Sequence, residues 1–354
     1  MTLFRGYAED MPLHKWLKEK IWPLEAKQTP GDIELAAKLA FCEMIHGGTT
    51  SFVEMCIHDT KPIFTAANEI GMRGLIAQGV LNLGDDSKNH ELLKKTKNTI
   101  EYQTEKLKAS IAAHAPYTCS EELLIKTKEL ADKHTLKYQI HASETRKEVF
   151  DIQKRINKYP IEYLDSIGII DENSIFAHCG WLTKSEMNLL GKNNAAISHC
   201  PISNLKLATG GIAQITELSD AGALITLGTD SVASNNSLNL FETMKLASLL
   251  QHHHYWKADI IPTQRIFDFA TLNGAKAIGF NCGSLEKEKI ADIVLLEKNA
   301  NMQPNHDPIA NIVYSAGPQN VSDVIIDGKI IMRDKKITTI DEQNICRAVE
   351  AHFS

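Results

Sequence analysis

The stretches KYQIHAS (137–143) and SIFAHCG (174–180) decide the predicted fold. Each is an apolar run about as long as a buried parallel strand, and each carries a histidine near its end. Runs of the same kind lie at 49–55, 73–80, 109–115, 195–201 and 223–230. Amphipathic, helix-like stretches accompany them at about 30–48, 61–70, 89–107, 120–134, 145–157, 184–193, 211–222 and 237–254. Strands that alternate with helices predict a parallel sheet.

The polar residues of these runs distinguish between two kinds of parallel sheet. They lie at the C-terminal ends of the runs: Glu54, His114, His141, His178, His199 and Asp230. A barrel gathers its active site at the C-terminal rim of all its strands, whereas an open doubly wound sheet uses mainly its switch point. No GxGxxG or P-loop motif supports the open sheet. We therefore predict an α/β fold, a TIM-like (β/α)8 barrel over residues 1–285, with seven of its strands in this chain.

The last part of the chain has a different pattern. Residues 290–297 and 321–337 have the composition of strands, and the second stretch predicts a hairpin around Asp327-Gly328. We predict that residues 286–354 form the C-terminal β segment of a small composite domain, the remnant of a β-sandwich, followed by a terminal helix.

The composition argues against several classes of partner. The chain has 38 basic and 44 acidic residues, a net charge of −6, so nothing in it favours nucleic acid or a membrane surface. No apolar run reaches the roughly 18 residues of a membrane span, and the start lacks a secretory pattern. The seven cysteines are scattered without a CxxC pair, which predicts a reducing, cytoplasmic compartment. A homo-oligomer is an assembly that the sequence allows.

The stretch IHASE places His141 three residues before Glu144 at a strand end, and AHCGW and LGTDS add His178 and Asp230. Imidazole and carboxylate groups suit zinc or iron, and a nearby carboxylate can move protons for a metal-bound water. Each residue alone also fits a structural role, as a satisfied polar group or a helix cap. Their recurrence on successive strand ends favours a metal-dependent hydrolase.

These four residues have separable roles in such a site. The metal would lower the pKa of a bound water from about 15.7 toward 7. Asp230 and His178 would orient that water and accept its proton, and Glu144 would pass the proton to a ring nitrogen and then to the leaving group.

Two other groups of histidines favour structural roles. His199 ends a strand but is expected only to shape the rim. His252, His253 and His254 follow one another in a helix-like stretch, where consecutive side chains point in different directions, so we expect a solvated helix surface.

The chain resembles the amidohydrolase superfamily, in the branch of 5′-methylthioadenosine/S-adenosylhomocysteine deaminases and related chlorohydrolases. The resemblance covers nearly the whole chain through the stretches RGYAEDMPLHKWL, IWPLE, GGTTSFVEM, AAHAPYT, IHASET, AHCGWL, SHCPISNLKLATGG, LGTDSVASNN and ADIVLL. It implies a barrel that holds Zn²⁺, or another divalent metal such as Fe²⁺, and that deaminates a small-molecule nucleoside.

The resemblance also implies residue roles. His141 and Asp230 match metal ligands, and His178 matches the strand-end histidine beside the metal and its water. Glu144 matches the carboxylate that moves protons and contacts the base, which Asp230 also faces.

For the rest of the substrate, Glu25 matches a carboxylate that holds ribose hydroxyls. His114 matches a substrate-contacting histidine, and Trp16 matches an aromatic residue that lines the pocket. A carboxylate can accept two hydroxyl donors, and an aromatic face suits a purine.

The sequence departs from the family in two places. The HxH motif that ends the family's first strand precedes a stretch like Met1–Gly6, so we expect that strand and its two histidines to be absent and the chain's activity to be impaired. Members that act on S-adenosylhomocysteine tend to have arginines after the third strand. The corresponding stretch here has none, and Gln78 and Lys88 are the nearest candidates.

Three functions remain open from the sequence. The first is a deaminase of an adenosine-type nucleoside (5′-methylthioadenosine, S-adenosylhomocysteine or 5′-deoxyadenosine), which Glu25 favours. The second is the same scaffold acting on guanine, a pterin or a chlorotriazine. The third is a truncated chain without catalytic activity.

Overall fold

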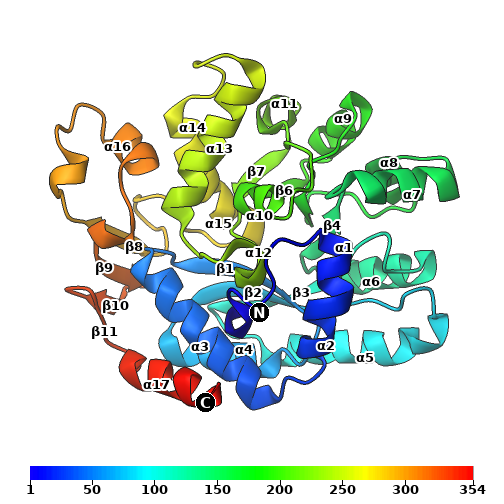
Figure 1. Ribbon diagram of the computed structural model, residues 1–354, viewed down its shortest axis with the longest axis horizontal. Coiled ribbons are helices and arrows are strands. Elements are labelled where there is room, and N and C mark those ends of the chain that lie inside the picture. The colour runs from blue at the N-terminus through cyan, green and yellow to red at the C-terminus, as the bar shows by residue number, and fades with distance from the viewer. Residues whose placement is uncertain (354) are drawn as a thin grey trace.

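The computed structural model describes residues 1–353, and its centre is a curled sheet of parallel strands surrounded by helices (Figure 1). The sheet has seven strands in sequence order: Ser51–Cys56 (β1), Arg73–Val80 (β2), Leu107–Ala113 (β3), Tyr138–Ala142 (β4), Ser174–His178 (β5), Ala196–His199 (β6) and Leu224–Leu227 (β7). Every neighbouring pair is parallel. Within residues 1–353, β7 and β1 do not pair, so the curled sheet stays open between them. The predicted barrel-like α/β fold with seven strands is confirmed.

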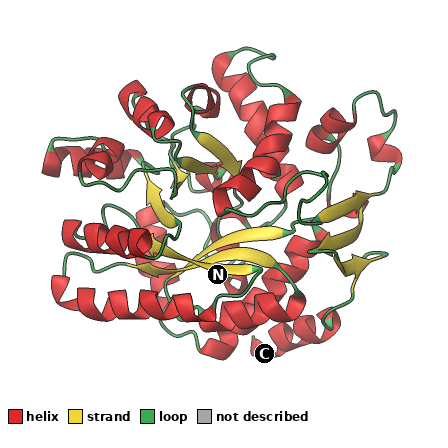
Figure 2. Ribbon diagram, turned by 180° about the vertical axis from the view of Figure 1, so that it is seen from behind, coloured by secondary structure: helices red, strands yellow, loops and turns green. Residues whose placement is uncertain are grey.

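Helices lie on the outside of this sheet and connect its strands (Figure 2). Before β7 they are Pro30–His46 (α3), Lys61–Ile70 (α4), Asn89–Thr99 (α5), Glu121–Lys133 (α6), Arg146–Ile156 (α7), Pro160–Ser166 (α8), Lys184–Lys192 (α9), Pro201–Lys206 (α10) and Ile215–Asp220 (α11). After β7 they are Val232–Asn235 (α12), Leu240–Tyr255 (α13), Thr263–Ala270 (α14) and Leu272–Ile278 (α15). Most agree with the predicted stretches.

Two predicted helices are shorter than expected. The helix expected to end at residue 107 ends at Thr99, because a short 3-10 turn and β3 occupy the following residues. The helix expected from residue 211 begins at Ile215. Gly210 has a φ of +83°, and a Cβ on Gly211 would lie 2.3 Å from the carbonyl oxygen of Gly180. This close passage of two loops keeps the segment out of a helix.

The N-terminal segment was not predicted as regular structure. It forms the short helices Leu13–Trp16 (α1) and Trp22–Glu25 (α2), joined by a π-helical turn. Apolar side chains of this N-terminal segment form a separate buried cluster that includes Phe4, Trp16 and Ile21. The indole Nε1 of Trp16 donates to the carbonyl of Ala8 at 3.0 Å, which fixes the ring in this cluster.

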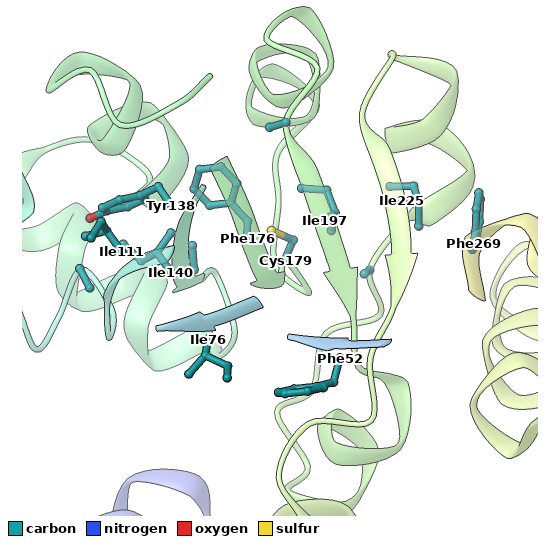
Figure 3. Close-up of a cluster of buried hydrophobic side chains, with 14 of the residues drawn as sticks. Phe52, Ile76, Ile111, Tyr138, Ile140, Phe176, Cys179, Ile197, Ile225 and Phe269 are labelled. Carbon is teal, nitrogen blue, oxygen red and sulfur yellow. The ribbon is translucent and has the colours of Figure 1, made fainter. Parts of the chain in front are cut away.

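The main core lies between the strands and the outer helices (Figure 3). Alternate strand residues fill it, and a buried Ile or Phe side chain stabilises the fold by about 1.5–3 kcal/mol. On β4, Tyr138 and Ile140 are buried in this core, while Gln139 and His141 line the cavity inside the curled sheet. Other core residues visible in the figure are Phe52, Ile76, Ile111, Phe176, Cys179, Ile197, Ile225 and Phe269.

A second, antiparallel sheet stands beside the first, at the left of Figure 1. Its strands are Ile293–Leu296 (β8), Val321–Ile326 (β9), Lys329–Arg333 (β10) and Lys336–Ile337 (β11), in the order β11-β10-β9-β8. The predicted hairpin around Asp327-Gly328 is confirmed, with φ values of +56° and +71°. Over residues 1–353 this part is a single sheet. Helix Pro308–Tyr314 (α16) precedes β9, and helix Glu342–His352 (α17) packs along α3.

A buried ion pair ties the two sheets together. The guanidinium of Arg73, the first residue of β2, donates to the carboxylate of Asp292 at 2.8 and 3.2 Å and lies 3.5 Å from that of Asp327. The side chains of Arg73 and Asp292 are 1% and 3% exposed.

No helix among residues 1–353 is long and apolar enough to cross a membrane. In the histidine run at the end of α13, His253 and His254 are exposed and His252 is half-buried, as expected for a helix surface.

Candidate active site

The carboxyl ends of the strands surround a cavity of about 430 Å³. His141 reaches it from β4, His178 from β5, and Asp230 from the loop after β7. The rings of His141 and His178 are stacked, with centroids 5.5 Å apart, and His178 Nε2 lies 3.9 Å from Glu144 Oε1. The structure thus brings together the four residues that the sequence singled out.

His141 is held in one tautomer by the backbone. Its Nδ1 lies 2.6 Å from the carbonyl oxygen of His114, and a carbonyl only accepts, so Nδ1 carries the proton. The lone pair of Nε2 is then free, as in histidines that bind metals. Burial lowers the pKa of His141, and the neighbouring His178 lowers it further. His141 is therefore neutral at pH 7.

His178 is oriented by a side chain of α10, the helix that follows β6. Its Nδ1 lies 2.8 Å from Asn204 Oδ1. The backbone is left-handed at His178 and Cys179, with φ of +74° and +50°. Such φ values are uncommon away from glycine and cost about 1–3 kcal/mol each. The strand end is held in this conformation by the hydrogen bond from the Cys179 amide to the Ala142 carbonyl.

Asp230 is held by hydroxyl groups. Ser203 Oγ and Ser234 Oγ donate to its Oδ2 at 2.5 and 3.0 Å, and the Ser231 amide donates to Oδ1 at 2.6 Å. Burial acts to raise the pKa of Asp230, but the charge of His178 and the hydrogen bond from Ser203 outweigh it, so the pKa falls below its usual value. Asp230 is thus a carboxylate whenever the site is near neutral pH.

The pKa of Glu144 is shifted in the opposite direction to that of Asp230. Its side chain is buried, and burial raises the pKa of Glu144 to about 8, an effect that His141 opposes and the charge of Asp230 reinforces. The site therefore pairs an ionised carboxylate, Asp230, with a carboxyl that holds its proton at pH 7. Such a pair suits proton transfer.

His114 directly follows β3 and lies next to His141, with ring centroids 5.0 Å apart. Its Nδ1 is 3.0 Å from Thr118 Oγ. Burial, together with His141 and His178, lowers the pKa of His114 to about 3, so the ring is neutral. A neutral imidazole in the cavity wall can exchange a hydrogen bond with a substrate.

Glu25 and Trp16 line the cavity from the N-terminal helices. Burial raises the pKa of Glu25 to about 7, the α-amino group of Met1 lowers it, and Glu54 raises it. Trp16 is 3% exposed. All the residues given a site role from the sequence therefore line one cavity.

The sequence reasoning missed the groups that orient the site. Ser203 and Asn204 hold Asp230 and His178, and both come from the stretch SHCPISN at the start of α10. Glu54 was noted only as a strand-end residue, but it lines the cavity, and burial raises its pKa. Strand alternation could have identified which residues face inward: Ser198 and Cys200 line the cavity, while His199 between them does not.

Neither candidate for binding a substrate carboxylate reaches the cavity. Gln78 donates to the carbonyl of Cys56 at 3.3 Å, and Lys88 forms an ion pair with Asp85. Among the described residues that line the cavity there is no lysine or arginine. Its acidic lining residues are Glu25, Glu54, Glu144 and Asp230.

The donors fit a divalent metal in their chemistry. His141 offers a free Nε2, and Asp230 offers a carboxylate held in place by donors. Within residues 1–353, however, no three His, Cys, Asp or Glu side chains converge closely enough to hold an ion without movement. His141 and Asp230, with His178 beside them, are the residues that could hold a metal here.

Comparison with known proteins gives a consistent result. The sequence profile of the amidohydrolase family matches residues 1–331. The 5′-deoxyadenosine deaminase of Methanosphaera stadtmanae is 44% identical over 349 residues, which cover 97% of this chain and 82% of that protein. The 5-methylthioadenosine/S-adenosylhomocysteine deaminase of Pyrococcus horikoshii is 36% identical, covering 98% of this chain and 83% of that protein.

Two solved structures are similar over the whole fold. An adenosine deaminase from Xanthomonas campestris with bound zinc has a TM-score of 0.91 and 30% identity, covering 99% of this chain and 81% of that chain. An atrazine chlorohydrolase from Arthrobacter aurescens, complexed with zinc, has a TM-score of 0.93 but 19% identity, covering 100% and 85% of the two chains. The second likeness concerns the fold alone.

Proposed function

Because this chain belongs to the amidohydrolase family, we propose that it hydrolyses the exocyclic amine of a 5′-modified adenosine, giving the inosine-type product and ammonia. It is a hydrolase that acts on carbon–nitrogen bonds. The relatives at 36–44% identity named 5′-deoxyadenosine deaminase or 5-methylthioadenosine/S-adenosylhomocysteine deaminase support this activity.

One observation carries the proposal. A protonated carboxyl, Glu144, and an ionised one, Asp230, face the same buried cavity. The imidazoles of His141 and His114, whose pKa values burial lowers, line it beside them. Hydrolytic deamination needs both an acid and a base at one carbon, and this arrangement provides them.

We propose that His141, Asp230 and His178 hold a divalent cation, zinc or another such as Fe²⁺. The zinc in the similar adenosine deaminase supports this assignment. When bound, such a cation acts as a Lewis acid and brings the pKa of a water from about 15.7 toward 7.

The residues of the chain move the protons. Water adds its oxygen to C6 of the purine while Asp230, with His178 beside it, takes one water proton. Glu144 gives its proton to N1 of the ring. The C6–N bond then breaks, and the proton held by Asp230 goes through Glu144 to the departing amine, which leaves as ammonia. The proton that remains on the C6 hydroxyl passes to Glu144, so that C6 becomes a carbonyl and Glu144 regains the proton it gave to N1. The atoms balance: nucleoside plus water gives the oxo product plus ammonia.

The substrate is held from the other side of the cavity. Glu25 would accept hydrogen bonds from the two ribose hydroxyls, which a carboxylate can do with its two oxygens. Trp16 would pack against the nucleoside, and His114 would hydrogen-bond to it. These roles follow the family pattern and agree with the position of the three residues in the cavity wall.

The charge of the cavity favours small, uncharged 5′ substituents. S-adenosylhomocysteine carries a carboxylate, which would find no lysine or arginine among the described lining residues. Desolvating a carboxylate without a partner is costly. We therefore propose 5′-deoxyadenosine and 5′-methylthioadenosine as better substrates than S-adenosylhomocysteine.

We also propose that the enzyme works in the cytoplasm. A reducing compartment suits the seven free cysteines, most of them buried. Residues 1–285 are proposed as the catalytic part and residues 286–354 as an accessory part.

Ammonia release from a panel of compounds tests the function. The purified chain, loaded with zinc, is assayed with 5′-deoxyadenosine, 5′-methylthioadenosine, S-adenosylhomocysteine, adenosine, guanine, a pterin and a chlorotriazine. We expect turnover of the first two and its loss after treatment with a chelator. Turnover of guanine, the pterin or the chlorotriazine alone would contradict the proposal, as would no turnover at all.

A further inference from the structure

The loop that carries Glu144 is fixed by a second buried glutamate. Glu148 lies in the first turn of α7 and is 1% exposed. One oxygen of its carboxylate accepts from the Ser143 amide at 2.8 Å, and the other accepts from the Glu144 amide at 2.9 Å. Both oxygens thus accept from the first two of the three residues that connect β4 to α7.

This contact differs from ordinary helix capping. In a capping box, the glutamate at the third helical position returns to the amide of the N-cap residue. The N-cap of α7 is Thr145, whose hydroxyl accepts from the Glu148 amide at 3.1 Å. The Glu148 carboxylate extends past Thr145 to the two residues before it.

Helix α9 provides the matched comparison. Its N-cap is Thr183, and the buried Glu186 accepts from the Thr183 amide at 2.8 Å, completing the ordinary box. The other oxygen of Glu186 accepts from the amide of Ile161 at 3.0 Å. Both glutamates are therefore fully buried and bind two amides, but only Glu148 binds the residue that faces the cavity.

The loop needs this support because its backbone is strained. Ser143 has φ of +52°, in the left-handed region. A residue other than glycine keeps this conformation only when its surroundings fix it. The Ser143 carbonyl also accepts from the Trp181 amide at 3.0 Å, so both sides of the strained peptide are held.

We propose that Glu148 is the positioning residue of Glu144: by fixing the amides of Ser143 and Glu144, it aims the Glu144 carboxyl at the reacting ring of the substrate. This inference rests on the proposed function for the identity of the reaction. Glu148 itself is not proposed to contact the substrate.

Kinetics of matched variants test the inference. Glu148→Gln keeps the size of the side chain but turns an NH₂ group toward one of the two amides. We expect kcat for 5′-deoxyadenosine to fall by about 10–100-fold with KM changed less than about threefold, since catalysis depends on geometry more than binding does. Glu186→Gln makes the same chemical change at α9 and should leave kcat within about twofold.

A double-mutant cycle separates positioning from general stability. In a Glu144→Gln background, adding Glu148→Gln should lower kcat by less than about twofold, because the group being positioned is already lost. The inference would be overturned if the two substitutions lowered kcat independently of each other. It would also be overturned if Glu148→Gln left kcat unchanged, or if Glu186→Gln lowered kcat as much as Glu148→Gln does. If Glu148→Gln does not fold, Glu148→Asp, which keeps the carboxyl group but shortens its reach, should give the same split between kcat and KM.

Hydrogen exchange provides a readout that does not need activity. We expect the Ser143 and Glu144 amides, in a peptide covering 139–147, to exchange faster in Glu148→Gln and at the wild-type rate in Glu186→Gln. An unchanged rate in Glu148→Gln would overturn the inference. If the wild-type chain shows no deamination while these amides respond as expected, the proposed function fails and the fixing of the loop by Glu148 stands.

Discussion

The rim of the curled sheet has two unlike sides. The histidine side consists of His114, His141 and His178 at the ends of β3, β4 and β5, three strands joined by continuous pairing. The carboxylate side consists of Asp230 after β7, Glu54 on β1 and Glu25 on α2, where β7 and β1 do not pair.

The two sides differ in how their polar atoms are satisfied. Each ring on the histidine side has its Nδ1 within hydrogen-bond distance of a carbonyl, amide or hydroxyl oxygen. On the carboxylate side, Asp230 is held by serines. Among the described residues, the carboxylates of Glu54 and Glu25 make no hydrogen bond. The rings of the histidine side and Asp230 are therefore oriented by hydrogen bonds, whereas Glu54 and Glu25 are not; the positive charge of the Met1 α-amino group acts on both of these glutamates.

The largest expected effect tests the acid that lies between the two sides. Glu144→Gln should lower kcat for 5′-deoxyadenosine by about 10³-fold, because general acid–base catalysis contributes about 10²–10⁴-fold. Steady-state ammonia release measures it. Glu122→Gln, an exposed change on α6, is the control and should retain full activity. A Glu144→Gln variant with more than a tenth of the activity would show that another group moves the proton.

A change on the carboxylate side should lower the affinity of the site for zinc. Ser203→Ala removes one of the two hydroxyls that hold Asp230 Oδ2, and we expect zinc affinity to fall by about 10–100-fold, as for other groups that orient a metal ligand. Competition with a zinc indicator measures it. Ser219→Ala on α11 is the control. Equal zinc affinity in both variants would remove Asp230 from the metal site.

Glu25 tests whether the carboxylate side binds ribose. Glu25→Gln should raise the inhibition constant of the inosine-type product by about tenfold, the loss expected for a hydrogen bond to a charged group. Hypoxanthine lacks the ribose and should bind both forms equally. If its inhibition constant rises as much as that of the nucleoside, Glu25 acts on something other than the sugar.

Glu25 should also make the stability of the fold depend on pH. The pKa of Glu25 is raised by burial to about 7, so between its ordinary value of 4.5 and about 7 the folded chain holds a proton that the unfolded chain has released. The contribution of Glu25 to the unfolding free energy therefore falls as pH rises through this window, by at most about 1.4 kcal/mol per unit. Urea unfolding of the metal-free chain at pH 5 and 7 should show a shallower fall for Glu25→Gln. Identical slopes would show that Glu25 is not buried as a neutral acid.

The histidine side was the easier to predict from sequence. A histidine at the end of a parallel strand reaches the rim whatever the details of the loop, so His141 and His178 could be placed together from the strand pattern alone. Asp230 followed for the same reason. The seven strands and most helices were also predictable, because each apolar run was of strand length and most helices began and ended at recognisable residues.

The supports of the site could not be predicted in this way. The position of Glu148 at the start of α7 predicts a capping contact within the helix, and only the path of the preceding loop brings Ser143 and Glu144 to it. The short helices α1 and α2 have too few turns for a periodic pattern, and their burial depends on contacts distant in sequence. In these places tertiary packing, not local sequence, decides the structure.

The ion pair of Arg73 with Asp292 has a consequence for how the molecule melts. Separating the small sheet from the large one would leave the buried guanidinium of Arg73, which is 1% exposed, without its carboxylate partner. Breaking a buried ion pair costs about 3–5 kcal/mol. Partial opening along that boundary is therefore suppressed. We therefore expect the two sheets to unfold as a single cooperative unit, with one calorimetric transition in place of two.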